Sequence, residues 1–222
     1  MKCLAPWHSI LVRFNGDIVP DGVYKARYGN VLKSSLNDVL NSYTATHTKD
    51  SLRMGQLPPE CEQCALKEES VGHSRRLFFR DILNPMVENK EYDYSKNFTD
   101  ILFLEFNMSN ICNLKCRMCN GISSSAWVKE EKKLAEISAD YQRPVDHPEF
   151  GYTNKSEEII QRLFEDPTPF MNLRYLSIKG GEPYMEPANK KILQKFIDLG
   201  VAKNVTLDWT TNGTIVDEEV QE

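Results

Sequence analysis

Apolar and polar positions alternate in short blocks near the start of the chain. Residues 9–14 form an apolar, β-prone run, and residues 15–16 (Asn-Gly) are a strong signal for a tight hairpin turn. Residues 17–19 can return as the partner strand. The pattern therefore predicts a short β-hairpin close to the N-terminus.

Helical spacing follows this hairpin. Apolar residues recur at the helical period over residues 35–43, and a second helix is expected over residues 74–83. We expect Pro85 to end the second helix, because proline cannot donate the hydrogen bond that would continue it. Residues 88–97 are polar, carry charges of both signs and are typical of a linker.

The pattern changes from residue 99 onward. Short, mostly apolar runs at residues 101–106, 173–178 and 205–209 have the character of strands buried in a parallel sheet. Helical spacing separates them, at residues 123–138, 156–165 and 187–199, with an insertion at residues 140–155. Alternation of strand and helix predicts right-handed βαβ units and a parallel sheet.

Each predicted strand of this sheet leads into a distinctive loop. The cysteine loop (residues 112–119) follows the first strand, the GGEP loop (residues 180–183) follows the second, and the TNG loop (residues 211–213) follows the third. The carboxyl ends of parallel strands share one edge of the sheet, and ligands bind at that edge in α/β proteins. We therefore expect the three loops to form one site.

Charge and hydropathy narrow the classes of function. The 222 residues carry a formal net charge of −5 and no clustered Lys and Arg, which gives no support to a nucleic-acid-binding surface. No apolar run approaches the roughly 18–20 residues that a membrane span requires. The first ten residues lack the apolar core of a secretory signal. We expect a cytoplasmic protein with no membrane partner.

Six cysteines in such a chain point to metal or redox chemistry before disulfides. The cysteine loop contributes three of them in a CxxxCxxC pattern, Cys61 and Cys64 form a CxxC pair, and Cys3 stands alone. This distribution predicts two sites rather than one.

The cysteine loop has the spacing of a cluster site. A structural zinc ion takes four protein ligands, usually from two separated pairs. Cys112, Cys116 and Cys119 lie within eight residues, so they can surround one small group and leave a coordination position open. That arrangement suits a cubane iron–sulfur cluster, because soft thiolates favour iron–sulfur clusters. A zinc site completed by a distant histidine, or a set of buried thiols, is the alternative.

The sequence Cys112-Asn-Leu-Lys-Cys116-Arg-Met-Cys119 after a strand, followed by GGEP at the next strand end, resembles the radical S-adenosylmethionine (radical SAM) superfamily. The resemblance implies a partial TIM-like (β/α) barrel. It also implies that the three thiolates hold three irons of a 4Fe-4S cluster. The fourth iron would bind the amino and carboxylate groups of S-adenosylmethionine.

The same resemblance assigns roles to neighbouring residues. Gly180 and Gly181 would let the backbone approach the cofactor, because they carry no Cβ. Carbonyl groups near Pro183 and the Glu182 carboxylate would receive the amino group of S-adenosylmethionine. Asn212 would hydrogen-bond the cofactor, and Met118 would pack near the adenine. For Glu182 a solvated loop acid, and for Asn212 a turn-forming residue, are the alternatives.

Reductive cleavage is the reaction that this resemblance implies. A one-electron reductant of the flavodoxin or ferredoxin type would reduce the cluster, and S-adenosylmethionine would yield methionine and a 5′-deoxyadenosyl radical. That radical would abstract hydrogen from a substrate, which we expect to be a peptide or protein side chain. An electron-transfer protein that never cleaves S-adenosylmethionine, or a zinc-stabilised interaction module, is the alternative class.

The N-terminal part is similar to a twitch or SPASM-type auxiliary-cluster module. The similarity rests on Cys3 with the following Pro-Trp, on the Asn-Gly hairpin, and on the Cys61–Cys64 pair. Members usually carry a cysteine where this chain has Asp21. A second iron–sulfur cluster, a zinc ion, or neither could therefore occupy the site, and Asp21, His8 or His73 could supply the missing ligand.

These features together predict a two-part chain of α/β class. Residues 1–95 would form the auxiliary module, a small α+β unit, and residues 96–222 the first part of a radical SAM core. Only three strands of the expected barrel are present. We therefore expect a chain truncated after the third strand, whose substrate-selecting residues lie elsewhere.

Overall fold

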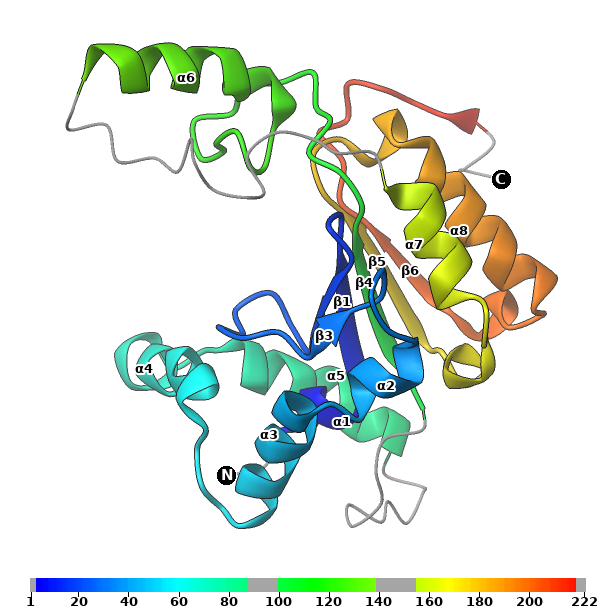
Figure 1. The fold of residues 1–222 in the computed structure, drawn as a ribbon. Helices are drawn as coiled ribbons and strands as arrows, with labels where there is room; N and C mark the ends of the chain where they lie inside the picture. The colour runs from blue at the N-terminus through cyan, green and yellow to red at the C-terminus, as the bar shows by residue number, and fades with distance from the viewer. Residues whose placement is uncertain (1–2, 88–99, 139–154, 219–222) are drawn as a thin grey trace.

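The computed structural model describes residues 3–87, 100–138 and 155–218 (Figure 1). The strands are β1 (Ser9–Arg13), β2 (Asp17–Val19), β3 (Gly29–Asn30), β4 (Phe103–Asn107), β5 (Tyr175–Lys179) and β6 (Thr206–Trp209). The helices are α1 (Ala5–His8), α2 (Leu36–Leu40), α3 (Tyr43–Arg53), α4 (Glu62–Val71), α5 (Arg75–Val87), α6 (Val128–Ile137), α7 (Ser156–Leu163) and α8 (Pro187–Asp198).

The six strands form one mixed sheet in the order β3-β2-β1-β4-β5-β6. β4, β5 and β6 run parallel, with Glu105 opposite Ser177 and Ser177 opposite Asp208. The parallel arrangement predicted for these three strands is therefore confirmed. The expected barrel is not present among the described residues, because β3 and β6 lie at opposite edges and do not pair, whereas a barrel requires its first and last strands to pair.

The N-terminal hairpin is part of the same sheet. β1 and β2 pair antiparallel across the Asn-Gly turn, as the sequence predicts, and Gly16 adopts the positive φ of 84° that this turn requires. β1 also pairs in parallel with β4, in a register that sets Leu11 opposite Glu105. One sheet therefore passes through both segments, 1–95 and 96–222, into which the sequence divides the chain.

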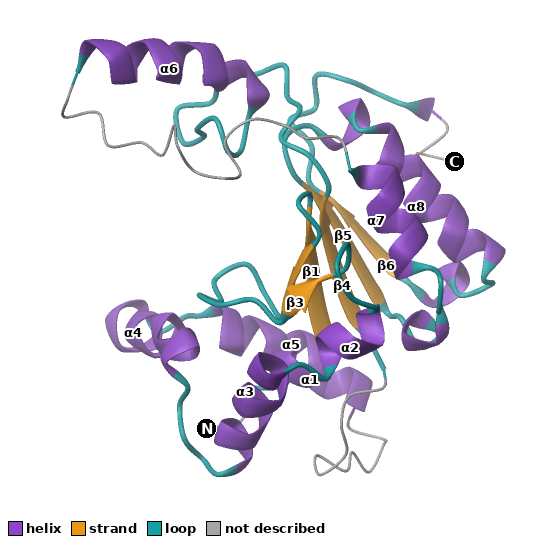
Figure 2. Cartoon of the chain, viewed as in Figure 1, coloured by secondary structure: helices purple, strands orange, loops and turns teal. Residues whose placement is uncertain are grey.

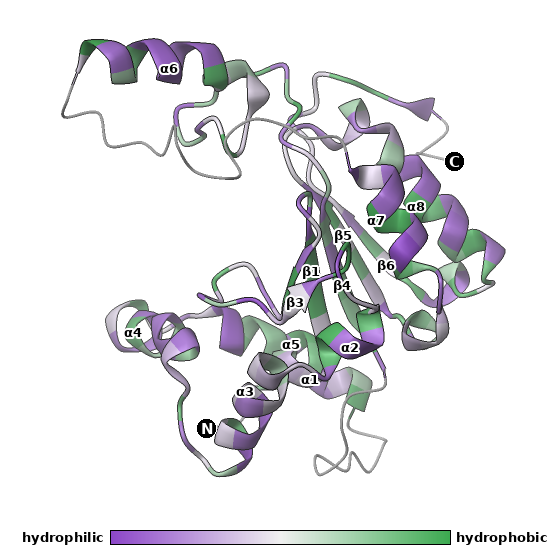
Figure 3. Ribbon diagram, viewed as in Figure 1, coloured by the Kyte–Doolittle hydropathy of each residue, from purple (hydrophilic) through white to green (hydrophobic). Residues whose placement is uncertain are grey.

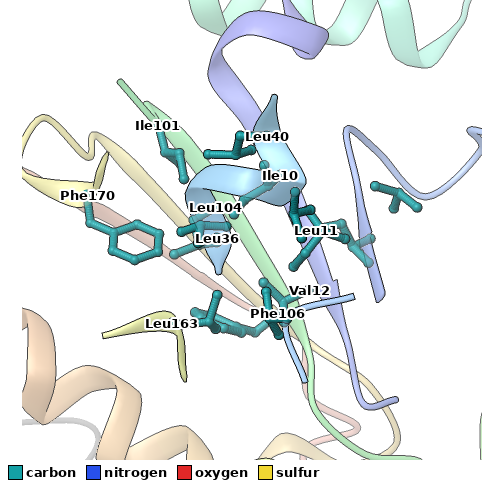
Figure 4. Packing of buried hydrophobic residues seen from close by; sticks show 14 of the residues in the cluster. Ile10, Leu11, Val12, Leu36, Leu40, Ile101, Leu104, Phe106, Leu163 and Phe170 are labelled. Carbon is teal, nitrogen blue, oxygen red and sulfur yellow. The ribbon is translucent and has the colours of Figure 1, made fainter. Parts of the chain in front are cut away.

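One face of the sheet carries the main hydrophobic core. Alternate strand residues such as Val12, Leu104 and Ile178 point to this face and are fully buried. Figure 2 shows α7 and α8 lying along it, and Figure 4 shows strand residues packed against Leu36 and Leu163. α7 and α8 carry both hydrophobic and hydrophilic residues (Figure 3), as expected for helices with one buried side.

The opposite face of the sheet is mixed in character. At the end where the parallel strands begin, Phe103 packs against Phe79 of α5 and stacks on Tyr175. Further along the strands the face becomes polar. There the buried Glu105 carboxylate pairs with Lys179 at 3.0 Å and with Arg75 at 3.5 Å.

Two helix boundaries differ from the prediction. The helix expected over residues 35–43 ends at Leu40, and Tyr43 begins α3, because Ser42 caps a new helix by accepting a hydrogen bond from the Ala45 amide. α5 continues through Pro85 to Val87. Pro85 lies in the last turn of α5, where few hydrogen bonds are lost, and Leu83 and Val87 remain buried in the cluster around Phe103.

The predicted linker at residues 88–97 and most of the insertion at residues 140–155 lie outside the described residues. Among the helices that the structure does describe, none is both long enough and apolar enough to cross a bilayer.

Candidate functional site

The three distinctive loops meet at the carboxyl edge of β4, β5 and β6. Their backbones are in direct contact: the Gly181 amide donates to the Ser109 carbonyl at 2.9 Å, and the Glu182 amide donates to the Ile111 carbonyl at 2.6 Å. The GGEP loop is therefore bonded to the segment that leads into Cys112. Figure 1 shows the chain segments that leave the three strands crossing at this end of the sheet.

The two glycines are required by this contact. A Cβ on Gly180 would lie 2.5 Å from the Ser109 carbonyl oxygen, and a Cβ on Gly181 would lie 2.2 Å from the Ile111 carbonyl oxygen. Gly180 also adopts a φ of 134°, which side-chain-bearing residues rarely adopt. Both glycines therefore admit the backbone of the loop before Cys112, and their approach to a cofactor stays a prediction.

Glu182 joins the GGEP loop to the TNG loop. Its side chain is fully buried. Oε1 accepts hydrogen bonds from the Thr211 hydroxyl at 2.8 Å and the Tyr184 amide at 3.2 Å, and Oε2 accepts one from the Asn212 amide at 2.8 Å. Glu182 is therefore not a solvated loop acid. Its carboxylate is a structural connection between two of the three loops.

Asn212 completes the connection to the cysteine loop. Its side-chain amide donates to Asn113 Oδ1 at 3.0 Å and approaches Cys112 Sγ at 3.7 Å. Asn113 in turn donates to the Thr214 hydroxyl at 2.8 Å. Asn212 also accepts from the Thr214 amide, so it acts both as a turn residue and as a contact to the cysteine loop.

The cysteine loop is held from its other side by the short helical turn at residues 125–127, directly before α6, and by α6 itself. The Cys112 amide donates to the Ser125 hydroxyl at 3.2 Å, and the Trp127 indole donates to the Cys116 carbonyl at 3.1 Å. The fully buried Glu131 accepts a hydrogen bond from the Gly121 amide at 2.8 Å. These contacts restrain the loop backbone before any ligand binds, which lowers the entropic cost of binding.

The three thiols of the cysteine loop lie near the surface. Cys116 is exposed, whereas Cys112 and Cys119 are partly buried. Burial and the neighbouring Cys116 and Cys112 raise the pKa of the Cys119 thiol, so the three sulfurs lie close enough to interact. Cys112 Sγ accepts a hydrogen bond from the Leu114 amide at 3.4 Å. Met118 is 93% exposed, so its side chain is not part of the packed loop.

The other three cysteines gather at the opposite end of the strands, where β1 begins. Cys3 precedes β1, and β2 runs antiparallel to β1, so the residue after β2 returns to the edge at which β1 begins. Asp21 is thereby brought to Cys3. The Ser9 hydroxyl secures this corner by donating to the Pro20 carbonyl at 2.8 Å.

A cavity at this edge brings Cys3, Asp21, Cys61 and Cys64 together. Glu60 also lines the cavity, and its buried Oε2 has no hydrogen-bond partner among the described residues. The two histidines considered as ligands lie elsewhere. His8 is buried against the Asp100 carbonyl, His73 is exposed, and neither lines the cavity.

The first turn of α5 faces Cys64. The backbone amides of Arg76 and Arg75 donate hydrogen bonds to the Cys64 thiol and lower its pKa, although burial has the larger effect and raises it. Unpaired amides at a helix N-terminus favour a thiolate. Glu68 of α4 receives hydrogen bonds from Arg76 and from Ser74, which hold the two helices in this arrangement.

Burial dominates the protonation of the N-terminal thiols. Burial, with smaller contributions from neighbouring thiols and Asp21, raises the pKa of Cys3 and of Cys61 to about 12 in each case. Burial also raises the pKa of the Asp21 carboxyl. In a closed space these thiols and the carboxylate resist ionisation, because burial disfavours their charged forms. A bound metal would compensate the negative charge of its ligands, so the site fits a cationic group.

Neither site is arranged around a single point. Within the described ranges, no set of three or more His, Cys, Asp or Glu side chains converges closely enough to hold one metal ion. A single zinc ion needs its donors within about 2.0–2.3 Å of one position. A cubane cluster instead presents separate iron atoms to its ligands, so its thiolates lie farther apart. The donor sets in the described ranges therefore do not form a ready-made site for a single ion.

Sequence reasoning missed the residues that support the cysteine loop. Ser125, Trp127 and Glu131 lie in the segment that was predicted only as a helix over residues 123–138. Their one sequence signal was their place directly after the last cysteine. Glu60 was also missed, although it immediately precedes Cys61.

Comparison with known proteins supports the N-terminal assignment. Residues 3–65 match the family model of SPASM, described as an iron–sulfur cluster-binding domain. The match contains Cys3, Asp21, Cys61 and Cys64 and covers less than a third of the chain. No curated protein and no solved structure matches the chain.

Proposed function

We propose that this protein is a radical SAM enzyme with an N-terminal auxiliary iron–sulfur site. In this proposal the cysteine loop binds a 4Fe-4S cluster through Cys112, Cys116 and Cys119, and S-adenosylmethionine binds beside it. The cluster supplies the electron that cleaves S-adenosylmethionine, which yields a 5′-deoxyadenosyl radical for hydrogen abstraction from the substrate.

One observation carries the proposal. The three loops form a single hydrogen-bonded unit. In this unit the backbone amide of Asn212 donates to Glu182, and the side-chain nitrogen of Asn212 lies 3.7 Å from Cys112 Sγ. Residues that the resemblance assigns to cluster and cofactor therefore lie together, although 100 positions of sequence separate Cys112 from Asn212. The SPASM match at residues 3–65 supports the proposal independently, because it concerns the other end of the chain.

The chain's own residues would perform three tasks. The thiols of the cysteine loop hold the cluster, and the amides of Leu114 and Asn212 hydrogen-bond to the Cys112 sulfur. The buried Glu182 carboxylate keeps the GGEP and TNG loops together, so that both loops would meet the cofactor in a fixed arrangement. The exposed Met118 is free to pack on the adenine once the cofactor is bound.

The proposal also includes an electron donor and a substrate. A flavodoxin or ferredoxin would deliver the electron, and a peptide or protein side chain would donate the hydrogen. Residues 96–222 would form the catalytic part and residues 1–95 the auxiliary part.

Cleavage of S-adenosylmethionine tests the proposal directly. The chain is reconstituted anaerobically with iron and sulfide, reduced with dithionite in the presence of S-adenosylmethionine, and assayed for 5′-deoxyadenosine by mass spectrometry. We expect release from the unchanged chain and none from Cys116→Ala. Because Cys116 is exposed, its truncation should leave the fold intact.

Cys61→Ala is the matched control, since it removes one thiol from the other site. We expect it to retain cleavage. Equal release from Cys116→Ala and the unchanged chain would overturn the proposal. A bound cluster without cleavage would instead support an electron-transfer protein, and zinc without iron would support a zinc-stabilised module.

A further inference from the structure

The N-terminal cavity presents one donor that is not a thiol beside its three thiols. Cys3, Cys61 and Cys64 line this cavity together with Asp21, which is only 9% exposed. Asp21 reaches the cavity because β2 ends where β1 begins, and Cys3 lies just before α1, which leads directly into β1. The fold therefore delivers a carboxylate to a space otherwise supplied with soft sulfur donors.

The loop around Asp21 holds its side chain in place. Oδ1 accepts a hydrogen bond from the Val23 amide at 2.6 Å, which closes a turn of the Asx type. The carboxylate is therefore held in a fixed position in the wall of the cavity.

Two carboxylates, Asp21 and Glu60, line the cavity together with the thiols. Asp21 is the more deeply buried of the two, because it is 9% exposed whereas Glu60 is partly exposed. Of the two carboxylates, Asp21 is therefore the more enclosed by the cavity.

We propose that Asp21 is a direct ligand of the N-terminal cluster and completes a set of three thiolates and one carboxylate with Cys3, Cys61 and Cys64. The inference rests on the proposed auxiliary iron–sulfur site and specifies its fourth ligand. A carboxylate is a harder donor than a thiolate, so it holds its iron more weakly than cysteine would. The iron bound by Asp21 is the one that leaves first.

The consequence is a defined oxidation reaction. Ferricyanide removes one electron, the iron held by Asp21 leaves as Fe²⁺, and a 4Fe-4S cluster of charge +2 becomes a 3Fe-4S cluster of charge +1. The three thiolates stay bound to the remaining irons. Electron paramagnetic resonance detects the 3Fe-4S product, and iron analysis counts the released ion.

The test uses the full chain with Cys112, Cys116 and Cys119 changed to Ala, so that only the N-terminal site can bind a cluster. We expect this background protein to release one iron per cluster on oxidation. Adding Asp21→Cys should slow the release by about tenfold or more, because a thiolate replaces the carboxylate. Adding Asp21→Asn should speed the release by a similar factor, and its side-chain oxygen can still accept from Val23.

Glu60→Gln is the matched control, because it neutralises the other carboxylate that lines the cavity. We expect it to behave as the background protein does. Circular dichroism checks that each variant is folded. Unchanged iron release in both Asp21 variants, or a change confined to Glu60→Gln, would overturn the assignment of Asp21 and leave the cluster in place. A background protein that binds zinc and no iron would overturn the auxiliary cluster itself, and the ligand with it.

Discussion

The two cysteine sites lie at opposite ends of one sheet and differ in how their thiols are exposed or enclosed. The cysteine loop follows β4 and exposes Cys116, while the N-terminal site precedes β1 and encloses its thiols with carboxylates in a cavity. Figure 1 shows α6 near one end of the sheet and α1, α4 and α5 near the other. Both sites contain three cysteines, so their number does not decide the difference.

The difference shows what each environment favours. At the cysteine loop, contacts from the turn before α6, the GGEP loop and the TNG loop restrain the backbone, and the Cys116 thiol is exposed. At the N-terminal site, burial is the main cause that raises the pKa of Cys3 and Cys61 to about 12, while the Ala5 amide favours a thiolate at Cys3 and the first turn of α5 favours one at Cys64. An accessible site suits exchange with a second ligand, and a closed site suits a permanently bound group.

The largest expected difference is in thiol reactivity. A rise in pKa from 9.0 to about 12 lowers the thiolate fraction of Cys3 and Cys61 by about 1,000-fold relative to an ordinary thiol. We expect pulsed iodoacetamide, applied to the metal-free reduced chain at neutral pH, to modify Cys116 first. Mass spectrometry of peptides gives the rate for each cysteine, and the denatured chain is the control in which all six react. Equal rates at Cys3 and Cys116 would remove the distinction between the two sites.

A smaller effect is expected from Gly181→Ala. The added Cβ would lie 2.2 Å from the Ile111 carbonyl oxygen, so the GGEP loop and the segment before Cys112 must separate. We expect a loss of about 2–3 kcal/mol in the free energy of unfolding, as for other overpacked positions. The cysteine loop should lose its iron while the N-terminal site keeps its own, so iron content should fall by about half. Chemical denaturation and iron analysis provide the two measurements.

Gly22→Ala is the comparison for this variant at the other site. Its Cβ would meet only Leu11 Cδ1, at an ordinary 3.7 Å. We expect little change in unfolding free energy or iron content. If both variants lost iron from both sites, the two ends of the sheet would not be independent.

The smallest expected effect is a dependence of stability on pH. Because the folded-state pKa of Cys3 is raised from 9.0 to about 12, the folded chain favours the protonated thiol. The stabilisation is fully present below pH 9 and is lost as the pH rises from 9 toward 12. We expect the difference in unfolding free energy between the metal-free chain and Cys3→Ser to shrink by at most about 1 kcal/mol per pH unit in this range. Urea denaturation at pH 7, 9 and 10.5 would measure it, and parallel curves would contradict the burial of Cys3.

The local pattern of apolar, polar and turn-forming residues was sufficient to predict most elements of the fold. The Asn-Gly turn between two β-prone runs predicted the β1–β2 hairpin, and strand–helix alternation predicted the parallel order of β4, β5 and β6. Pro85 was misjudged, because the packing of Leu83 and Val87 outweighs the local preference of a proline in the last turn. The helix over residues 35–43 was misjudged because Ser42 caps a new helix.

The candidate site could be predicted in its components but not in its contacts. The order of cysteine loop, GGEP and TNG implied a common edge, because parallel strands bring their carboxyl ends together. Glu182 as a bridge to Asn212, and the support of the cysteine loop by Trp127 and Glu131, could not be inferred. Such bonds depend on side-chain directions that the spacing of residues does not specify.

The sequence by itself determined the two groups of cysteines, the hairpin and the alternation that makes a parallel sheet, because these follow from spacing and local conformational preference. Only the tertiary structure decided that β1 pairs with β4 and joins both groups to one sheet, and that Asp21 lies beside Cys3, Cys61 and Cys64. Pairing between strands about 90 residues apart depends on which faces can be buried together, and that is a property of the whole chain.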